Sequence, residues 1–274
     1  MQVREYALAE GWYPRKTDEI HRFLSDFSAP NSQVRAAVAP HAGWYYCGRL
    51  AADAICRLDR EAETIVVLGG HLPARASPLF AMEDAVRTPL GLMPIDTELR
   101  SALMEKLSGS GDRFSDNTIE VLLPMVRFFF PDAMLLWLRL PAGIASFAAG
   151  KMIAEAAQKL KRRINVIASA DLTHYGRNFG FTPRGSGEKA LKWVKEVNDF
   201  NFIRAIEAGN PDEVLKYAEI DKASCSAGAV LGVMGFAEAC ALPNARLLEY
   251  STSADVIGDT APDSFVGYAA LVFG

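Results

Sequence analysis

The sequence lacks the motifs that identify several common classes of enzyme. It contains no Gly-x-Ser-x-Gly turn, which argues against an α/β-hydrolase triad. It contains no Gly-x-x-x-x-Gly-Lys-Ser/Thr loop, which excludes a P-loop NTPase. The glycine-rich dinucleotide fingerprint is also missing after the first predicted strand. Any chemistry must therefore come from other residues.

Basic charge and long apolar segments are scarce as well. The 274 residues include 29 Lys and Arg against 33 Asp and Glu, a formal net charge of −4, and no basic run is longer than residues 159–163. Proteins that bind a phosphate backbone need a basic face, so nucleic acid is not expected as a partner. Residues 225–237 form the longest weakly charged stretch, but it is too short to span a membrane and predicts a buried helix.

Signals for export are absent from the printed N-terminus. The segment MQVREYALAEGWYP has no apolar run of the kind found in a secretory signal. The four cysteines are Cys47, Cys56, Cys225 and Cys240, and none forms a Cys-x-x-Cys pair. We therefore expect free thiols in a cytoplasmic protein.

Apolar runs of strand length alternate with amphipathic stretches along the chain. The strongest predicted strand is residues 63–70, ETIVVLGG, a β-branched run that ends in two glycines. Further strands are expected at residues 34–40, 133–140, 164–170, 246–251 and 265–273, and residues 80–90 are a weaker candidate for a short pair of strands. Helices are expected at residues 47–60, 96–107, 117–130, 145–162, 211–220 and 225–241, and residues 187–209 are expected to form one helix or two. The near-continuous apolar strands predict one α/β domain over residues 1–274, with a central mixed, mostly parallel sheet flanked by helices on both faces.

Three of the four histidines follow predicted strands. His41 ends the first strand, His71 ends ETIVVLGG, and His174 follows residues 164–170 together with Asp171. Any one of them alone is more often just the first residue of a loop. Together they indicate a shared site, because ligands of open α/β sheets bind beyond the carboxyl ends of the strands. Neutral imidazole is also the commonest metal ligand among side chains.

Cys225 is a candidate for a third metal ligand. It begins the predicted helix 225–241, and a thiol at a helix N-terminus has a lowered pKa that makes thiolate available. The alternative is a small buried residue, the commonest fate of a free cysteine and the one we expect for Cys56 and Cys240. Cys47 lies near His41 in the sequence and is a weaker candidate.

Several short motifs occur in an order that resembles the MEMO family, named for a mediator of cell motility. Its bacterial and archaeal members are often labelled AmmeMemoRadiSam system protein B. The resemblance runs from about residue 3 to the C-terminus. The matching stretches are AEGWYP (residues 9–14), PHAGWYYCG (40–48), GGH (69–71), TPLG (88–91), IEVLLP (119–124) and SADLTHYG (169–176).

The resemblance implies a fold similar to that of class III, LigB-type, extradiol dioxygenases. Those enzymes hold non-haem Fe(II) with two histidines and a carboxylate, and they use a further histidine as acid and base. Carried over to this sequence, His41 and His71 match the two histidine ligands. Cys225 matches the cysteine that replaces the carboxylate in MEMO proteins. His174 matches the acid and base, with Asp171 beside it as a second candidate catalytic residue.

The sequence departs from the family pattern at one position of the expected pocket. The family commonly has Glu-His-Ser before its IEVQLP motif, whereas this chain has Asp-Asn-Thr, so Asn117 replaces a histidine. Asparagine forms hydrogen bonds but cannot carry a proton near neutral pH. Trp44, Tyr45 and Tyr175 are the other residues expected to line the pocket.

Two functions remain open at this stage. The first is a metal-dependent oxidoreductase that binds Fe(II) or, alternatively, copper or zinc, and that acts beside a radical SAM partner protein, as the bacterial family label implies. The second is a non-catalytic module in which the same pocket binds a peptide or buffers a metal. In that case Trp12, Tyr13, Trp44, Tyr45 and Tyr46 could line a recognition groove, although such residues are more often core.

Overall fold

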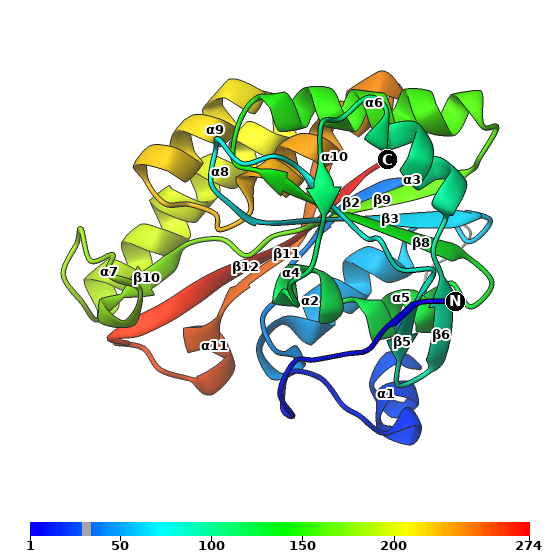
Figure 1. Ribbon diagram of the computed structural model, residues 1–274. Helices are drawn as coiled ribbons and strands as arrows, with labels where there is room; N and C mark the ends of the chain where they lie inside the picture. The colour runs from blue at the N-terminus through cyan, green and yellow to red at the C-terminus, as the bar shows by residue number, and fades with distance from the viewer. Residues whose placement is uncertain (29–33) are drawn as a thin grey trace.

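The computed structural model describes residues 1–28 and 34–274, and its strands form two sheets (Figure 1). The strands are β1 (Val3–Arg4), β2 (Ala36–Ala39), β3 (Thr64–Leu72), β4 (Leu79–Phe80), β5 (Ala85–Thr88), β6 (Gly91–Pro94), β7 (Ser110–Gly111), β8 (Met134–Pro141), β9 (Ile164–Ser169), β10 (His174–Gly176), β11 (Ala245–Thr252) and β12 (Ser264–Phe273). The larger sheet has the order β10-β12-β2-β9-β3-β8-β4-β7, with β11 paired to β12. A small second sheet has the order β1-β5-β6.

The centre of the larger sheet is parallel. Strands β2, β9, β3 and β8 run in the same direction, whereas β12 and β4 pair antiparallel at either side of them. Helices cover both faces of this mixed sheet, so the predicted fold class is confirmed. The weaker segment at residues 80–90 contributes β4 and β5, and the partner of β5 in the small sheet is β6, which the sequence did not indicate.

Two groups of helices enclose the sheet. The helices are α1 (Thr17–Leu24), α2 (Trp44–Cys56), α3 (Thr97–Met104), α4 (Asn117–Glu120), α5 (Leu123–Phe129), α6 (Ala145–Lys159), α7 (Glu188–Trp193), α8 (Asp199–Glu207), α9 (Pro211–Ile220), α10 (Ala227–Ala239) and α11 (Ser253–Ile257). Helices α6, α10, α8 and α9 lie on one face, and α2, α5 and α1 lie on the other (Figure 1). A 3₁₀ turn (Arg177–Phe179) follows β10, and a π-helical segment (Val194–Asn198) joins α7 to α8.

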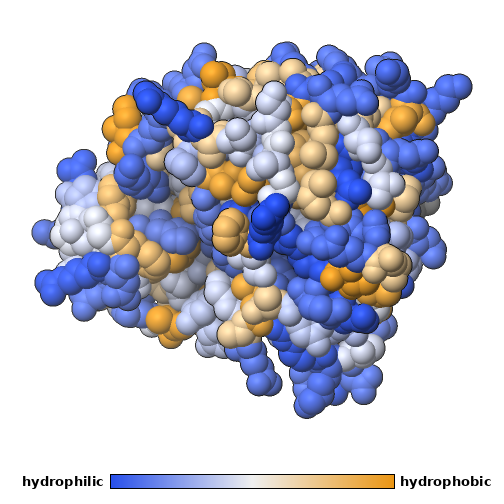
Figure 2. All heavy atoms as spheres, in the orientation of Figure 1, coloured by the Kyte–Doolittle hydropathy of each residue, from blue (hydrophilic) through white to orange (hydrophobic). Residues whose placement is uncertain are grey.

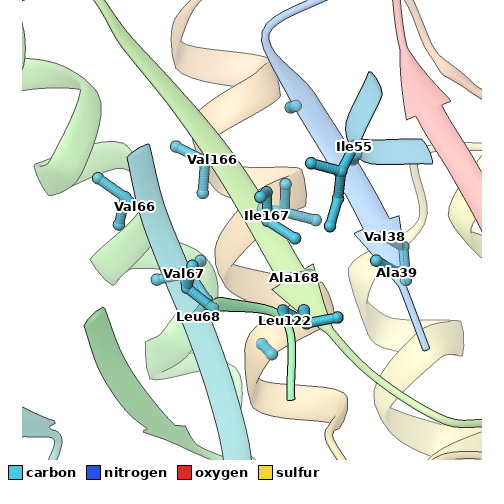
Figure 3. Packing of buried hydrophobic residues seen from close by; sticks show 14 of the residues in the cluster. Val38, Ala39, Ile55, Val66, Val67, Leu68, Leu122, Val166, Ile167 and Ala168 are labelled. Atoms are coloured by element: carbon cyan, nitrogen blue, oxygen red, sulfur yellow. The ribbon is translucent and has the colours of Figure 1, made fainter. Parts of the chain in front are cut away.

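Small residues allow α10 to pack closely against α6. A Cβ atom on Gly150 would lie 1.9 Å from the carbonyl oxygen of Gly232, so any larger residue would separate the two helices. The strands beneath them are apolar on both faces, with Val66, Val166 and Ile167 fully buried (Figure 3). This burial fixes the position of each strand end.

Polar residues dominate the face of the molecule shown in Figure 2, where apolar side chains occur in small separate groups. In the part of the chain that the structure describes, no helix combines the length and the apolar character needed to cross a membrane.

Two predicted helices differ from the structure. Residues 117–130 were expected to form one helix, but α4 ends at Glu120 and α5 begins at Leu123. Pro124 explains the break, because it cannot donate to the carbonyl of Glu120 and its ring would clash with that group. The helix expected from residue 225 begins at Ala227, with Ser226 at its N-cap, so Cys225 lies in the preceding loop.

Candidate metal centre

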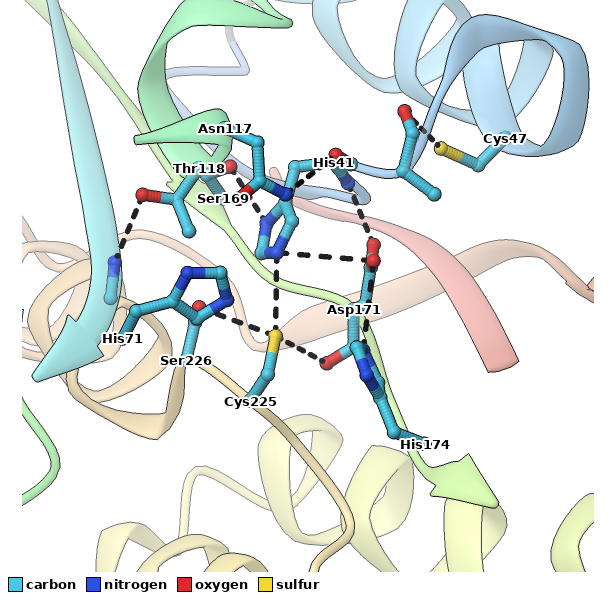
Figure 4. Close-up of polar contacts among 12 residues, drawn as sticks. His41, Cys47, His71, Asn117, Thr118, Ser169, Asp171, His174, Cys225 and Ser226 are labelled. Carbon is cyan, nitrogen blue, oxygen red and sulfur yellow. Dashed lines mark hydrogen bonds and ion pairs between the residues drawn. The ribbon is translucent and has the colours of Figure 1, made fainter. Parts of the chain in front are cut away.

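Three neighbouring parallel strands bring the predicted site residues to one edge of the sheet. Strand β9 lies between β2 and β3, so the carboxyl ends of all three meet. His41 follows β2, Asp171 follows β9, and His71 lies in the last part of β3. Figure 4 shows these side chains pointing toward one another, with Cys225 approaching from the loop before α10.

Two glycines allow His71 to come close to Cys225. A Cβ atom on Gly69 would lie 2.4 Å from Thr118 Oγ1, and one on Gly70 would lie 2.3 Å from Ser226 Oγ. The end of β3 is therefore held between α4 and the loop that carries Cys225. His71 itself has a φ of 58°, a left-handed conformation that non-glycine residues adopt at a cost of about 1–3 kcal/mol and mostly at functional sites.

His41, His71 and Cys225 form a group that could hold a metal ion. Their potential ligand atoms all lie within 4.8 Å of one another. His41 Nε2 lies 3.3 Å from Cys225 Sγ, and the two imidazole rings are nearly perpendicular, with centroids 5.2 Å apart. Two nitrogens and a thiolate form a donor set that suits zinc, copper or iron. The residues present thus fit a transition metal.

The outward-facing nitrogen of each imidazole already has a partner. His41 Nδ1 lies 3.0 Å from Ser169 Oγ, and His71 Nδ1 lies 3.4 Å from Asp116 Oδ2. Such contacts fix the tautomer and the orientation of a metal-binding histidine, and they leave Nε2 for the metal. This feature distinguishes the cluster from histidines that merely lie near one another.

A buried ion network supports Asp116, and the sequence analysis missed it. Arg139 Nη1 donates to Asp116 over 3.0 Å, and the same guanidinium holds Asp112 through two further bonds of 2.9 and 3.0 Å. Thr118 donates to Asp116 from both its backbone nitrogen and its hydroxyl. A signal was present in the sequence, since Arg139 is a single charge within the apolar run MLLWLRL.

The histidines, rather than a helix, set the ionisation of Cys225. Burial alone would raise the pKa of this thiol, but the imidazoles facing it hold the pKa well below its usual value. Cys225 lies just before the N-cap of α10 and not within the helix, and the three histidines that face it account for the lowered pKa. Burial lowers the pKa of His71, but Asp116 and Cys225 outweigh it and raise the pKa to about 10 in the metal-free protein. Thiolate and imidazolium therefore face each other before metal binds.

Asp171 and His174 lie next to the cluster. Asp171 is buried, and its Oδ1 accepts a hydrogen bond of 2.7 Å from the backbone nitrogen of His41. Its Oδ2 lies 3.8 Å from His41 Nε2 and 3.9 Å from His174 Nε2. His174 Nε2 is buried and has no hydrogen-bond partner within the described residues. Asp171 and His174 therefore lie side by side at the cluster, and their catalytic role stays a prediction.

Of the four residues expected to line the pocket, one lies at the cluster. Asn117 Nδ2 donates to the carbonyl oxygen of His41 over 3.4 Å. Trp44 and Tyr45 instead border a separate groove with Glu10 and Arg15.

Tyr175 lies within a small apolar cluster and is fully buried, and its hydroxyl donates to Gly185. The reason is strand alternation in β10. His174 faces the pocket, so the next side chain must face the other way.

The chain matches known proteins along almost its whole length. A family model described as Memo-like protein matches residues 4–272. A MEMO1 family protein of Pyrococcus abyssi is 31% identical, over 98% of this chain and 99% of that protein. Another, of Methanosarcina mazei, is 27% identical over 99% of both. The crystal structure of an uncharacterized protein from Escherichia coli K12 covers 88% of this chain and 100% of that one with a TM-score of 0.57, but at 16% identity it shows the fold alone.

The fold and the cluster together define an α/β protein with a candidate metal centre at the carboxyl edge of a mixed sheet. Within that class, the chain belongs to the Memo-like protein family, which confirms the resemblance drawn from its motifs.

Proposed function

We propose that this protein is a metal-dependent oxidoreductase whose metal is held by His41, His71 and Cys225. The observation that carries the proposal is the convergence of three donor atoms within 4.8 Å, with the outward nitrogen of each imidazole already engaged. Fe(II) is the metal we propose first, with copper and zinc as alternatives. A radical SAM partner protein, as the bacterial family label implies, is part of the same proposal.

The residues around the cluster have distinct tasks in this proposal. A redox metal bound there would supply one-electron chemistry and Lewis acidity. Asp116 holds the His71 ring in place through its Nδ1. His174 carries a proton to or from the substrate through Nε2, and the nearby Asp171 carboxylate stabilises the protonated ring.

A non-catalytic module is the second candidate function, and two observations favour it. Asn117 replaces the family histidine and contacts the backbone of His41, so one group able to move protons is absent from that position. Tyr45 is 70% exposed beside a groove that Trp44 and Phe23 also line, an arrangement that suits a peptide. In this case the metal, if bound, has no catalytic task.

The test of the metal centre is a titration of the parent protein and Cys225→Ser with Zn(II) and Fe(II), under reducing, anaerobic conditions. Serine replaces a thiolate with a neutral hydroxyl, so affinity should fall by tenfold or more, about 1.4 kcal/mol for each decade. Affinity in the parent should also weaken at mildly acidic pH, because protons compete for thiolate and imidazole.

Cys240→Ser is the matched control, since Cys240 is partly exposed and borders a different pocket, beside Arg35. Equal affinities for the parent and Cys225→Ser would remove Cys225 from the site. A bound metal without redox turnover would favour the module.

A further inference from the structure

A pocket of about 330 Å³ opens directly beside the candidate metal cluster. This volume lies within the range of small-molecule sites. Its described lining consists of Leu172, His174, Phe179, Gly180, Phe181, Lys222, Ser224 and Cys225. Cys225 belongs to both the pocket and the cluster, and His174 lines the pocket next to the cluster, so a molecule bound here would reach the reacting groups.

The wall of the pocket is mainly apolar. Phe179 is 44% exposed, and its ring contacts the edge of His174 with centroids 4.9 Å apart. Phe181 and Leu172 add further apolar surface. A flat ring or short hydrocarbon chain placed against these side chains would cover apolar surface that now faces water.

Lys222 provides the one fixed positive charge among the described lining residues. It is exposed at the pocket, and its ammonium makes no hydrogen bond or ion pair within the described part of the chain. Arg139, near the cluster, is by contrast paired with Asp112 and Asp116. An unpaired cation beside apolar walls would attract an anionic group on an apolar ligand.

His174 offers the complementary contact at the inner end. Its side chain is about one-third exposed and lines the pocket, so a ligand hydroxyl or carbonyl could bond to the ring. Ser224 is unsuited to this task, because its hydroxyl already donates to the carbonyl oxygen of Asp171 over 2.9 Å. The pocket thus has a cation at its rim, apolar walls and a partly exposed imidazole beside the metal ligands.

We propose that this pocket binds a small carboxylic acid with an apolar body, whose carboxylate pairs with Lys222 and whose far end carries a polar group that meets His174. At about 330 Å³ the pocket is near the small end of the range for ligand sites, which suits a ligand with one ring or an equivalent chain. This proposal adds a ligand class to the proposed oxidoreductase function. It rests on that function only for the reaction of the bound acid, and not for its binding. The contacts with Lys222 and Phe179 do not need a metal.

The test is calorimetric titration with 3-(4-hydroxyphenyl)propionate and its neutral amide, using the full chain both metal-free and loaded with Zn(II). The parent should bind the acid about tenfold more tightly than the amide. In Lys222→Met the two affinities should become equal. Lys161→Met is a matched control, because Lys161 is also exposed and also has a positive φ (53°, against 51° for Lys222), and it should keep the preference.

A second variant and a salt series probe the rest of the pocket. Phe179→Ala should weaken the acid and the amide by the same factor, about threefold to tenfold, because it removes apolar contact only. The preference for the acid should also shrink as ionic strength rises, since Lys222 is exposed. An unchanged preference in Lys222→Met, or equal affinities for acid and amide in the parent, would overturn the proposal.

Two outcomes separate this proposal from the metal centre. If the acid is preferred only in the Zn(II)-loaded parent and not in metal-free protein, the carboxylate binds the metal, and the role of Lys222 is wrong while the metal centre stands. If the preference persists in metal-free protein and in Cys225→Ser, but no metal binds the parent, the acid-binding pocket stands and the proposed metal function fails.

Discussion

Two carboxylates lie on opposite sides of the cluster, and their surroundings differ. Asp116 contacts His71 and is also held by Arg139 and by Thr118. Burial would raise the pKa of Asp116, but its bonds to His71 and Thr118 hold it well below the usual range. Burial also raises the pKa of Asp171, and there it prevails, because only neighbouring histidines oppose it.

The comparison shows that the environment, rather than the residue type, assigns the task of each carboxylate. Asp116 is a permanent anion that fixes the orientation of His71. Asp171 has no arginine or lysine partner within the described residues, so its charge depends on the protonation of His41 and His174. One side of the site is built for position, and the other is built for proton movement.

The largest expected effect comes from removing Arg139, the cation that holds Asp116 in place. Arg139→Met leaves Asp112 and Asp116 without their shared partner in buried surroundings. We expect the free energy of unfolding to fall by about 3–5 kcal/mol in urea denaturation. Lys151→Met is the control, because it removes an exposed pair with Glu238 and should cost less than about 1 kcal/mol. Similar losses in both variants would contradict the structural role of the network.

The second prediction concerns Asp199, which bonds to Thr173, the residue before His174, and so lies on the side of the site that moves protons. This buried carboxylate accepts hydrogen bonds from Thr173 and Tyr250, yet burial outweighs them and raises its pKa from 3.8 to about 6. The native state therefore binds this proton more tightly than the unfolded chain does. Stability should fall as pH rises from about 4 to 6, by roughly 3 kcal/mol at most, and then level off.

Asp199→Asn should remove this decline and make the protein more stable than the parent at pH 7. Tyr250 can then accept from the amide instead of donating to the carboxylate, since its hydroxyl is free to rotate. The measurement is urea denaturation across this pH interval. A decline of the same size in Asp199→Asn would assign it to another group.

The third prediction separates position from charge. Asp116→Asn should weaken Zn(II) binding by about tenfold to a hundredfold, because carboxylates behind a metal-binding histidine have effects of this size. Asp112→Asn is the matched control, since Asp112 pairs with the same guanidinium without contacting His71. Zinc titration of the folded variants measures both. An equal loss in the two variants would mean that the whole network, rather than Asp116, positions the ring.

The sequence predicted those parts of the fold that depend on local pattern. The run ETIVVLGG became β3, and β2 and β9 end within one residue of their predicted ends. Strand-end histidines could be grouped into one site because parallel strands share an edge. Two further features could have been predicted from the sequence. Pro124 indicates the break after α4. Strand alternation after His174 indicates that Tyr175 points away from the pocket.

The ion network around Asp116 could not be predicted in the same way. Asp112, Asp116 and Arg139 come from a loop and a strand, and no sequence pattern gives their separation in space. Cys225 was identified as a metal-ligand candidate, but for a reason that the structure replaces: three imidazoles, rather than a helix N-terminus, lower the pKa of its thiol. Long-range electrostatics thus required the tertiary structure.

The smallest expected effect is on metal affinity when His174 is removed. His174 is outside the group of converging ligand atoms, and its Nε2 lies 3.9 Å from Asp171 Oδ2. His174→Ala should therefore change Zn(II) affinity by less than about threefold, 0.7 kcal/mol, while His71→Ala loses at least a hundredfold. Any reaction at the site should be impaired in His174→Ala even with metal fully bound. If His174→Ala lowers zinc affinity as much as His71→Ala does, His174 is a metal ligand. The side of the site that we assign to proton movement would then also contact the metal.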